Sequence, residues 1–482
     1  MNVNDLYTPL FDALVEHHQI QPLSFHVPGH KYGTFFYEKG FSFFQEVLKL
    51  DVTELTNLDD LHAPEGVIME AQQLAATLYG AKSTYFLVNG SSVGNLAMIL
   101  SCCQEADYVL VQRNCHKSII HGIQLAGAIP VFLAPQFDDE LHVPSYVSIN
   151  TIQEAIEQYP NAKALILTNP NYYGLSYTKL KDVIALAHIY NIPVLVDEAH
   201  GAHFIASSFF PTSAVELGAD IVIHSVHKTL PALTMGSYLH FNSSLIHEEK
   251  VKQYLRMLQT SSPSYLIMAS LDLARAYVQK LQGKEKEIQK GITFIVEMFE
   301  QLHGIRLVKT KNGDALQDPL KLTIQSTNGL TGYELQQVFE TSAIFPELAD
   351  PFNVLLILPL TTEWKIPEHL TNLQEILKMM NKQSKKGKNQ IPPIFYETRP
   401  VSRLPVSYKE LNKYSKTYVP FEQAIGKLSA EMIIPYPPGI PLLMNGERIE
   451  KEHIEQIQVL VGMKAKIQGG DRLKDKYIKI YG

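Results

Sequence analysis

The chain has 482 residues, 45% of them hydrophobic and 19% charged, which is the composition of an ordinary globular protein with two or three domains. A formal net charge of -7 argues against nucleic-acid binding as the main task, and no apolar run approaches the length of a membrane-spanning helix. The three cysteines match neither a disulfide framework nor a metal site, and the N-terminus lacks the pattern of a secretion signal. We therefore expect a cytoplasmic protein with no metal, no membrane contact and no nucleic-acid partner.

Short β-rich runs alternate with helix-length segments from about residue 70 to residue 245. Amphipathic stretches such as Ile152–Tyr159 and Leu180–Tyr190 predict helices between the strands. Strands separated by helix-length connections predict βαβ units, hence an α/β domain with a mostly parallel seven-stranded sheet covered by helices on both faces. The seven expected strands are Thr84–Val88, Tyr108–Val111, Pro130–Leu133, Ala164–Leu167, Pro193–Val196, Asp220–Ile223 and Ser237–His240.

Further along the chain, a helical region is expected from Glu248 to Leu302, with an interruption near residues 261–263. A smaller α+β unit follows, with strands expected at Ile305–Lys309, Leu320–Ile324 and Val354–Leu358. The polar and basic segment 381–389 predicts a linker, with an anion-binding patch as the weaker alternative. The predicted division is an N-terminal segment 1–70, a large domain 71–290, a small α+β domain 291–380, a linker 381–392 and a C-terminal α+β unit 393–482.

The turn after the first expected strand, Asn89–Asn95, has the features of an anion site. Gly90 permits a tight turn, and Ser91 and Ser92 offer hydroxyl groups at the start of the following helix. The exposed N–H groups and the dipole of a helix N-terminus attract phosphate. A well-capped turn without a ligand is the alternative interpretation.

His116 follows the second expected strand. A histidine at this position is most often a structural side chain. Ligands of open α/β sheets bind at the carboxyl ends of the strands, so stacking of His116 on a flat cofactor is the functional hypothesis.

Asp197 and Lys228 carry the strongest chemical signal. Asp197 ends an apolar strand, and Lys228 follows the next apolar strand. Pyridoxal phosphate (PLP) needs a lysine for its Schiff base and an anion that keeps its ring nitrogen protonated. Taken singly, the aspartate fits a capping residue and the lysine a solvated one. Together they predict a PLP site, in which burial and a nearby cation would activate the lysine.

The neighbours of this pair fit the same cofactor. Ala199 is small enough for a ring to lie against the backbone, and His200 is a candidate contact for the ring or the substrate. Ser225 and His227 flank the lysine on the side from which a phosphate would be reached.

Several segments resemble the bacterial ornithine/lysine/arginine decarboxylases, which have the aspartate-aminotransferase fold of PLP enzymes (fold type I). The resemblance extends over most of the chain, and the motifs occur in the order of the family. The matching segments are Phe25–Lys31, Asp51–Leu55, Leu58–His62, Asp197–His203, His227–Ala232, Ser261–Tyr265 and Ile433–Pro441.

The resemblance implies roles for individual residues. Lys228 would carry the cofactor, Asp197 would pair with its ring nitrogen, and His116 would stack on the ring. Ser262 would reach the phosphate from a partner subunit, because family members pair their active sites across a dimer interface. The other residues that the resemblance assigns are Ser91, Ser92, Ser225 and His227 for the phosphate, and His26, His30 and Lys31 for the mouth of the site.

The resemblance implies decarboxylation of a basic L-amino acid, with arginine favoured narrowly over lysine and ornithine because short members that lack the N-terminal wing domain resemble biosynthetic enzymes. The same absence favours a homodimer or tetramer over a decamer. Asp59, Asp60 and Glu431 are the candidates for the distal cation of the substrate. Asn171 and Met235 depart from the residues usual in the family and loosen the substrate assignment.

Two alternatives remain from the sequence. An aminotransferase or aldolase of the same fold would use Asp197 and Lys228 in the same way. An inactive PLP-binding relative would serve as a partner or regulator.

Overall fold

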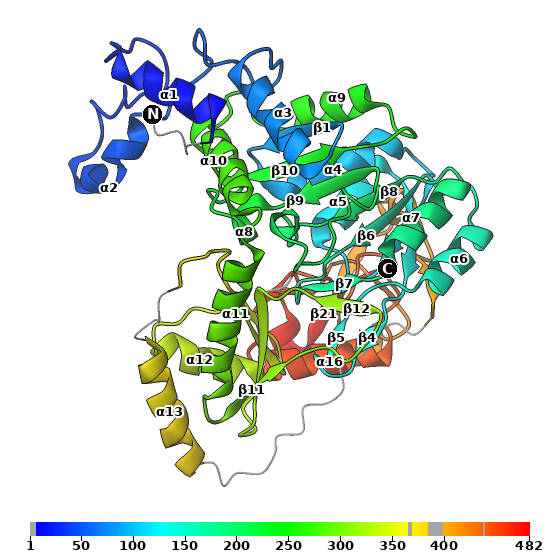
Figure 1. Ribbon diagram of the computed structural model, residues 1–482. Coiled ribbons are helices and arrows are strands. Elements are labelled where there is room, and N and C mark those ends of the chain that lie inside the picture. The colour runs from blue at the N-terminus through cyan, green and yellow to red at the C-terminus, as the bar shows by residue number, and fades with distance from the viewer. Residues whose placement is uncertain (1–5, 365–368, 384–398, 437–438) are drawn as a thin grey trace. The chain divides into compact units, whose positions relative to one another are not determined.

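The computed structural model describes residues 6–364, 369–383, 399–436 and 439–482 (Figure 1). The chain divides into two compact units. The first unit comprises residues 1–102 and 193–285, and the second comprises residues 103–192 and 286–482. Each unit is therefore assembled from two stretches that are distant in sequence.

The first unit contains four strands of the large sheet, in the order β1-β10-β9-β8. Strands β8 and β9 are parallel, whereas β10 runs antiparallel to both β9 and β1. The bounds are Ser83–Leu87 for β1, Val194–Asp197 for β8, Ile221–His224 for β9 and Ser237–Phe241 for β10.

Helices cover both faces of these strands. Gly94 of α4 (Gly90–Cys102) lies so close to Leu87 and Ile223 that an added Cβ would meet their side chains at 2.8 and 2.9 Å. Tyr79 of α3 (Val67–Tyr79) packs on the opposite face, where its ring lies 4.6 Å from that of His240. The remaining helices of this unit are α1 (Pro9–Gln19), α2 (Glu38–Leu48), α8 (Val226–Thr229), α9 (Glu248–Leu258), α10 (Tyr265–Leu281) and the short 3-10 turn η1 (Phe204–Ala206).

The N-terminal segment of the first unit has one buried helix and one exposed helix. Helix α1 packs on α3 and α10 through the buried Leu10 and Leu14. Helix α2 carries and follows a run of exposed aromatic side chains, which we call the aromatic face: Phe35, Phe36, Tyr37, Phe41, Phe43 and Phe44. Phe43 is 84% exposed and Phe35 is 71% exposed.

The second unit contains the strands β6 (Ala164–Thr168), β2 (Tyr108–Gln112), β3 (Ile129–Leu133) and β16 (Val401–Arg403), in that order. The first three are parallel, and β16 pairs antiparallel with β3. Helix α5 (Lys117–Ala126) connects β2 to β3, α6 (Ile149–Gln158) precedes β6, and α7 (Leu180–Ile189) follows it.

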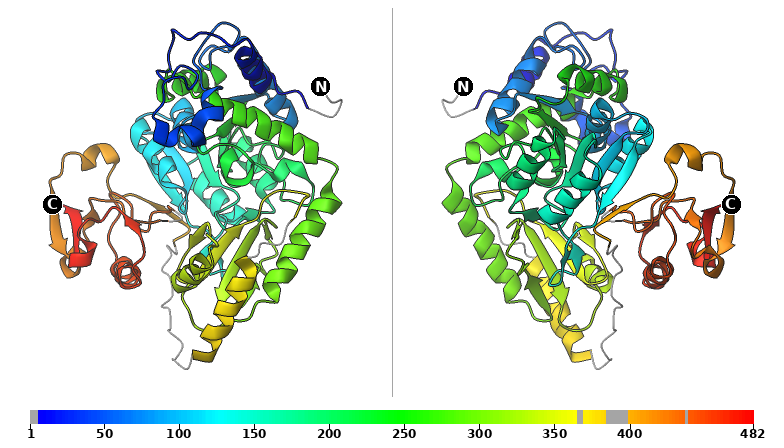
Figure 2. Two further views of the ribbon diagram at one scale, coloured as in Figure 1. Left: turned by 90° about the vertical axis from the view of Figure 1, so that its left-hand side faces the viewer. Right: turned by 90° about the vertical axis from the view of Figure 1, so that its right-hand side faces the viewer.

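A separate antiparallel sheet of the second unit has the order β11-β13-β15-β14. Helix α12 lies on this sheet and α13 lies on α12 (Figure 2). Trp364, the single tryptophan of the chain, packs against Gly291 of α11, where an added Cβ would lie 1.8 Å from the indole nitrogen. The bounds are Ile305–Val308 (β11), Lys321–Ser326 (β13), Leu348–Ala349 (β14), Asn353–Ile357 (β15), Glu285–Glu300 (α11), Gly332–Thr341 (α12) and His369–Gln383 (α13).

The C-terminal part of the second unit has its own core, which includes Ile433, Ile457 and Ile478. Its main sheet has the order β17-β21-β18. The elements are α14 (Tyr408–Leu411), β17 (Lys416–Pro420), α15 (Phe421–Ala424), β18 (Leu428–Ser429), β19 (Ile434–Pro435), α16 (Lys451–Gly462), β20 (Ile467–Gln468), η2 (Leu473–Asp475) and β21 (Tyr477–Tyr481). Three small strand pairs complete the unit: β19 with β20, β4 (Phe137–Asp138) with β5 (Val143–Pro144), and β7 (Leu175–Tyr177) with β12 (Ala315–Gln317).

The α/β class predicted from the sequence is confirmed, and each of the seven expected strands is present. Three features were not predicted: the antiparallel direction of β10, the added strand β16, and a second break in the helical region at Gly283, whose φ is +81°. Residues 384–392 of the expected linker lie outside the described residues, and the domain boundaries stay predictions. Within the described ranges, no helix is long and apolar enough to cross a membrane.

Candidate functional site

Lys228 and His200 lie together at the ends of β9 and β8. Lys228 belongs to the short helix α8, which starts directly after β9, and its Nζ is 3.0 Å from Nε2 of His200. His200 is buried and Lys228 is half-buried. Nδ1 of His227, next to the lysine, lies 3.1 Å from the carbonyl oxygen of Gly236, which fixes the loop that follows α8.

Asp197 is a buried carboxylate with two hydrogen-bond donors. Its Oδ2 accepts a bond of 2.9 Å from Nδ2 of Asn95, and its Oδ1 accepts one of 3.2 Å from the backbone N–H of Ala199. Burial raises the pKa of Asp197, and the positive charge of Lys228 and the bond from Asn95 oppose that rise. A cation bound beside this carboxylate would favour its charged form further.

The turn that begins α4 offers hydroxyl groups to an anion. Gly90 adopts a φ of +80°, which glycine tolerates best, and Ser91 accepts a 2.6 Å hydrogen bond from the buried Ser225. Ser92, one position further, is exposed. These side chains surround the N-terminus of a 13-residue helix, where a phosphate is stabilised.

This set of groups fits PLP. The cofactor needs an amine, a buried anion and a phosphate cradle, and Lys228, Asp197 and the Ser91–Ser225 pair supply these three in one unit of the fold. Ala199 lies directly after the anion and is also buried. Ser262 lies in the exposed loop between α9 and α10, whose start is held by a bond from the Thr260 N–H to Oδ1 of Asn89, in the same turn as Gly90.

His116 and Glu431 belong to the second unit. His116 caps α5, and its Nδ1 is 2.7 Å from Oγ of Ser118. Glu431 has burial as the main cause of a raised pKa, and its two carboxylate oxygens accept backbone N–H groups of Lys479 and Gly470 at 2.8 and 3.2 Å. The structural alternative for His116 is thus visible as a cap, and its cofactor role stays a prediction.

The acidic candidates of the N-terminal segment have local tasks. Both oxygens of Asp59 accept backbone N–H groups at the start of α3, and Oδ1 of Asp60 accepts the N–H of His62. Through these contacts Asp59 caps the N-terminus of α3. His30 is 3.1 Å from Oδ2 of Asp51 through Nε2 and accepts the Gly33 N–H through Nδ1.

The two departures from the family pattern also have local structural contexts. Oδ1 of Asn171 accepts the N–H groups of Tyr173 and Leu175, so this side chain organises its own turn. Met235 adopts a φ of +78° in the loop after α8 and is 47% exposed.

Two features near the cofactor residues escaped the sequence analysis. The sequence identified Asn95 only as the last residue of the expected turn Asn89–Asn95, and did not predict its bond to Asp197. Glu198 and His224, each fully buried, lie 3.7 Å apart beside Asp197. Their only sequence signal was that polar residues flank apolar strands.

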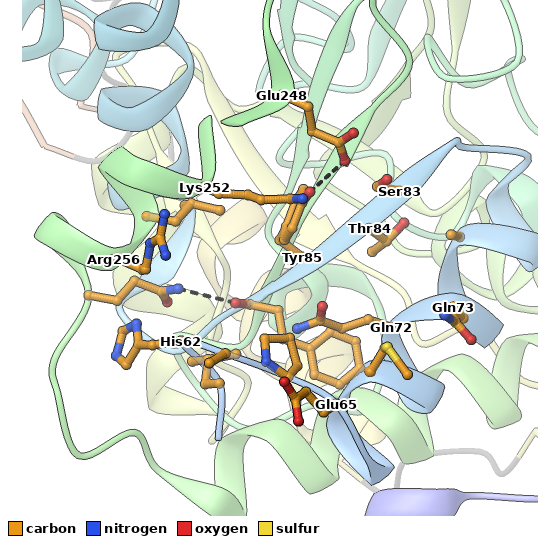
Figure 3. A pocket seen from close by; sticks show the side chains of 18 of the residues that line it. His62, Glu65, Gln72, Gln73, Ser83, Thr84, Tyr85, Glu248, Lys252 and Arg256 are labelled. Atoms are coloured by element: carbon orange, nitrogen blue, oxygen red, sulfur yellow. Dashed lines mark hydrogen bonds between the residues drawn. The ribbon is translucent and has the colours of Figure 1, made fainter. Parts of the chain in front are cut away.

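The first unit also contains an open pocket of about 530 Å³ between α3, β1 and α9 (Figure 3). Its wall includes Gln72, Thr84, Tyr85 and Arg256. Tyr85 donates a 2.5 Å hydrogen bond to Glu248. The predicted cofactor residues are not part of its lining, and Oγ1 of Thr84 lies 2.8 Å from Nδ1 of the buried His240.

Comparison with known proteins identifies the family. The family model described as Orn/Lys/Arg decarboxylase, major domain, matches residues 8–310, and the model of the C-terminal domain matches residues 396–469. The chain belongs to the Orn/Lys/Arg decarboxylase family. It is accordingly a PLP-dependent amino acid decarboxylase, as the resemblance implied.

Relatives within this family are similar over nearly the whole chain. The uncharacterized protein YaaO of Bacillus subtilis (strain 168) is 51% identical over 98% of both chains. An arginine decarboxylase of the same organism is 35% identical over 93% of both chains. The lysine decarboxylase LdcA of Pseudomonas aeruginosa is 26% identical over 92% of this chain and 74% of its own.

Solved structures agree on the fold. The lysine decarboxylase LdcF of Francisella novicida superposes with a TM-score of 0.82, at 20% identity, over 99% of this chain and 82% of its own. This likeness confirms fold type I of the PLP enzymes.

Proposed function

We propose that this decarboxylase of basic amino acids acts on L-arginine, releasing carbon dioxide and forming agmatine. The observation that carries the chemistry is the placement of Lys228, His200 and Asp197 at the ends of two adjacent parallel strands, with Asn95 of α4 bonded to Asp197. When bound, PLP acts as the electron sink for the carbanion that decarboxylation leaves.

The residues of the chain would supply binding and proton control. The buried Asp197 carboxylate would keep the ring nitrogen protonated, and Asn95 would hold that carboxylate in place through its 2.9 Å bond. The N-terminus of α4, with Ser91 and Ser225, would hold the phosphate. His116 stacking on the ring and Ser262 reaching from a partner subunit remain predictions from the family resemblance.

His200 is well placed to exchange a proton with Lys228. An imidazole nitrogen 3.0 Å from Nζ accepts a proton from the ammonium group, leaving the neutral amine that acts as a nucleophile. The same pair would return a proton to the α-carbon after carbon dioxide leaves. Within the chain, Lys228 and His200 are therefore the candidates for general acid–base work.

Arginine is favoured over lysine by the pattern of similarity. The arginine decarboxylase of B. subtilis matches this chain over 93% of its own length, at 35% identity. The lysine decarboxylase LdcA matches at 26% over 74% of its length. A guanidinium and an ammonium both pair with a carboxylate, so the substrate is decided by experiment.

The test is an assay of purified, PLP-loaded protein with arginine, lysine and ornithine, following carbon dioxide and the amine product. We expect agmatine formation with kcat/KM for arginine at least tenfold above the other two substrates, since one well-placed charged contact contributes about that factor. A preference for lysine or ornithine would replace the substrate assignment. Retention of PLP with no amine from any of the three would support the inactive-relative hypothesis instead.

Of the three acidic candidates for the distal cation, Asp59, Asp60 and Glu431, Glu431 is the one we test by substitution. Replacement Glu431→Gln would raise KM for arginine about tenfold or more while changing kcat less, because it removes a charged binding contact. Glu450→Gln, at the N-cap of α16, is the matched control in the same part of the chain. An unchanged KM in Glu431→Gln would remove this residue from the site.

We also propose that the protein works as a homodimer or tetramer. The aromatic face on α2 supports this, since soluble monomers rarely expose so many adjacent apolar side chains. A second copy is the occupant we propose for it, and Ser262, in the same unit, is the residue that the resemblance assigns to a neighbouring site.

A further inference from the structure

The loop between β2 and α5 is attached to the C-terminal part of the second unit by Arg113. This residue directly follows β2, and only 12% of its side chain is exposed. Its guanidinium group donates bonds of 2.9 and 3.2 Å to the carbonyl oxygens of Pro441 and Leu442, and Nη2 lies 2.8 Å from Oε2 of Glu447. Because a guanidinium group donates in fixed directions, these bonds define where residues 441–447 lie relative to β2.

The segment that Arg113 binds is itself held in place. Oε2 of Glu447 accepts a 2.8 Å bond from the Met444 N–H, which fixes the carboxylate within the C-terminal part. Ile440 packs against a buried hydrophobic cluster of the second unit. Residues 439–442 are therefore anchored both by Ile440 and by the two carbonyl bonds from Arg113.

His116 lies three residues after Arg113 and beside the 439–442 segment. A Cβ added to Gly439 would lie 3.4 Å from Cδ2 of His116, so the glycine backbone lies next to this edge of the imidazole. The other edge is bound to Ser118, whose N–H donates to Nδ1 over 3.3 Å and whose Oγ lies 2.7 Å from the same atom. The ring is therefore restrained at two edges, and one of these restraints belongs to the C-terminal part.

Lys117 attaches the same loop on the other side of His116. Its Nζ donates a 2.7 Å bond to Oε1 of Gln468 and lies 5.6 Å from the centre of the Tyr436 ring, within the range of a cation–π interaction. Gln468 belongs to β20 and Tyr436 directly follows β19, so both partners lie in the C-terminal part. The loop that carries His116 is thus attached to this part of the chain on both sides of the histidine.

We propose that Arg113 is a positioning residue for His116. Through the 439–442 segment it holds the imidazole in the orientation that stacking on the cofactor requires. The ion pair with Glu447 is by itself weak evidence for a stabilising role, because desolvation offsets much of the attraction between buried charges. This inference rests on the stacking of His116 in the proposed function. It gives the region matched by the family's C-terminal domain model, residues 396–469, a task in cofactor binding.

The first test needs neither cofactor nor activity. Spectra of cofactor-free protein with 13C-labelled histidine report the surroundings of each ring, and the His116 signal is identified by its loss in His116→Gln. Arg113→Lys keeps the charge, but an ammonium group cannot reproduce the forked bonds to Pro441, Leu442 and Glu447. We therefore expect Arg113→Lys to shift the Cδ2 signal of His116.

Two controls accompany these spectra. Arg448→Lys changes the residue next to Glu447, whose guanidinium group donates a 2.5 Å bond to the Gly426 carbonyl, and it should leave the His116 signal in place. His247, an exposed histidine at the N-cap of α9 in the first unit, should give the same signal in every variant. A His116 signal that stays in place in Arg113→Lys, or that moves equally in Arg448→Lys, would overturn the proposal.

The second test is a double-mutant cycle on PLP affinity, measured by titration of cofactor-free protein. We expect Arg113→Lys to lower the affinity about tenfold when His116 is present, a coupling usual for residues of one contact network. In the His116→Ala background the same change should lower it less than about twofold, because the ring that Arg113 positions is gone. Equal losses in the two backgrounds would indicate a general weakening of the fold, and they would overturn the proposal, as would no loss in either.

The cycle also separates this inference from the proposed function. If His116→Ala bound PLP as tightly as the unaltered protein, that result would count against the proposed stacking of His116. The spectra of cofactor-free protein would then still decide whether Arg113 sets the position of the ring.

Discussion

Asn95 illustrates how one side chain ties a helix to the chemistry of a strand. Its amide donates to Oδ2 of Asp197 across 102 residues of sequence, and both residues are buried. Hydrogen bonds to charged groups are stronger than those between neutral groups. The bond lowers the pKa of Asp197 and so favours the anion that the ring nitrogen requires.

Replacement Asn95→Ala would weaken PLP binding about 10- to 100-fold, the usual loss for a buried bond to a charged group. The affinity is measured by titration of cofactor-free protein, with Lys228→Ala as the reference that loses the covalent link. Ser101→Ala, on the same helix but bonded only to Met98, is the matched control. Equal PLP affinity in Asn95→Ala and the unaltered protein would exclude this role.

At the residue scale, the sequence predicted the groups that a local sequence pattern identifies. Asp197 and Lys228 each follow an apolar strand, and their residue types suit one cofactor. The positions of Asn95, Glu198 and His224 near the site could not be predicted, because their contacts are with residues on other strands and helices. The pairing of His224 with His240 depends on the register of two antiparallel strands, which no local pattern contains.

Among the elements, helix α3 depends on one acid. Asp59 accepts four backbone N–H groups at the start of the helix, from Glu65, Gly66, Ile68 and Met69, and it has a φ of +67°. Burial raises its pKa, but these bonds outweigh burial, and the net shift is downward. Tyr265 also donates to the Asp59 carbonyl, so the cap connects α3 to α10.

Replacement Asp59→Ala would lower the free energy of unfolding by about 2–3 kcal/mol, since it removes the cap and leaves a non-glycine residue without local support at positive φ. Asp59→Asn is the matched control, because asparagine tolerates this φ and still accepts hydrogen bonds. Denaturant unfolding of the full-length protein measures the loss of unfolding free energy in Asp59→Ala and in Asp59→Asn. Equal losses in the two variants would contradict the capping role.

The same residue gives a pH dependence. The pKa of Asp59 is lower in the folded protein than in the unfolded chain, where it is near 4 by the usual values for aspartate. Its contribution to the free energy of unfolding is therefore fully present above the unfolded pKa. That contribution is lost as the pH falls through the folded pKa. Asp59→Asn would lose this part of the acid sensitivity.

The alternation of strands and helices was visible from the sequence, whereas the direction of β10 was not. The connection from β9 to β10, residues 225–236, is long enough to precede a strand of either direction.

At the scale of the whole molecule, we expect the exposed aromatic face to be buried against a second copy of the chain. The double variant Phe35→Ser with Phe43→Ser would shift the protein toward monomers, measured by sedimentation at several concentrations, because it removes the two most exposed rings of the face. Ile189→Ser, at an exposed position at the end of α7 and outside the aromatic face, is the control. An unchanged distribution of species in the double variant would place the interface elsewhere.

The discontinuous units also bear on folding. The first unit needs residues 193–285 to pair β1 with β10, so its sheet forms only after residues 103–192 of the second unit have been synthesised. Such long-range pairing slows folding relative to local contacts.

The packing of Trp364 on Gly291 gives this chain a built-in optical probe. The single indole lies against α11 in the second unit, whereas Lys228 and Asp197 lie in the first. Tryptophan emission would therefore follow the melting of one unit, and the absorbance of bound PLP would follow the other. Recording tryptophan emission and PLP absorbance on one unmodified sample would tell whether the two units unfold together or one after the other.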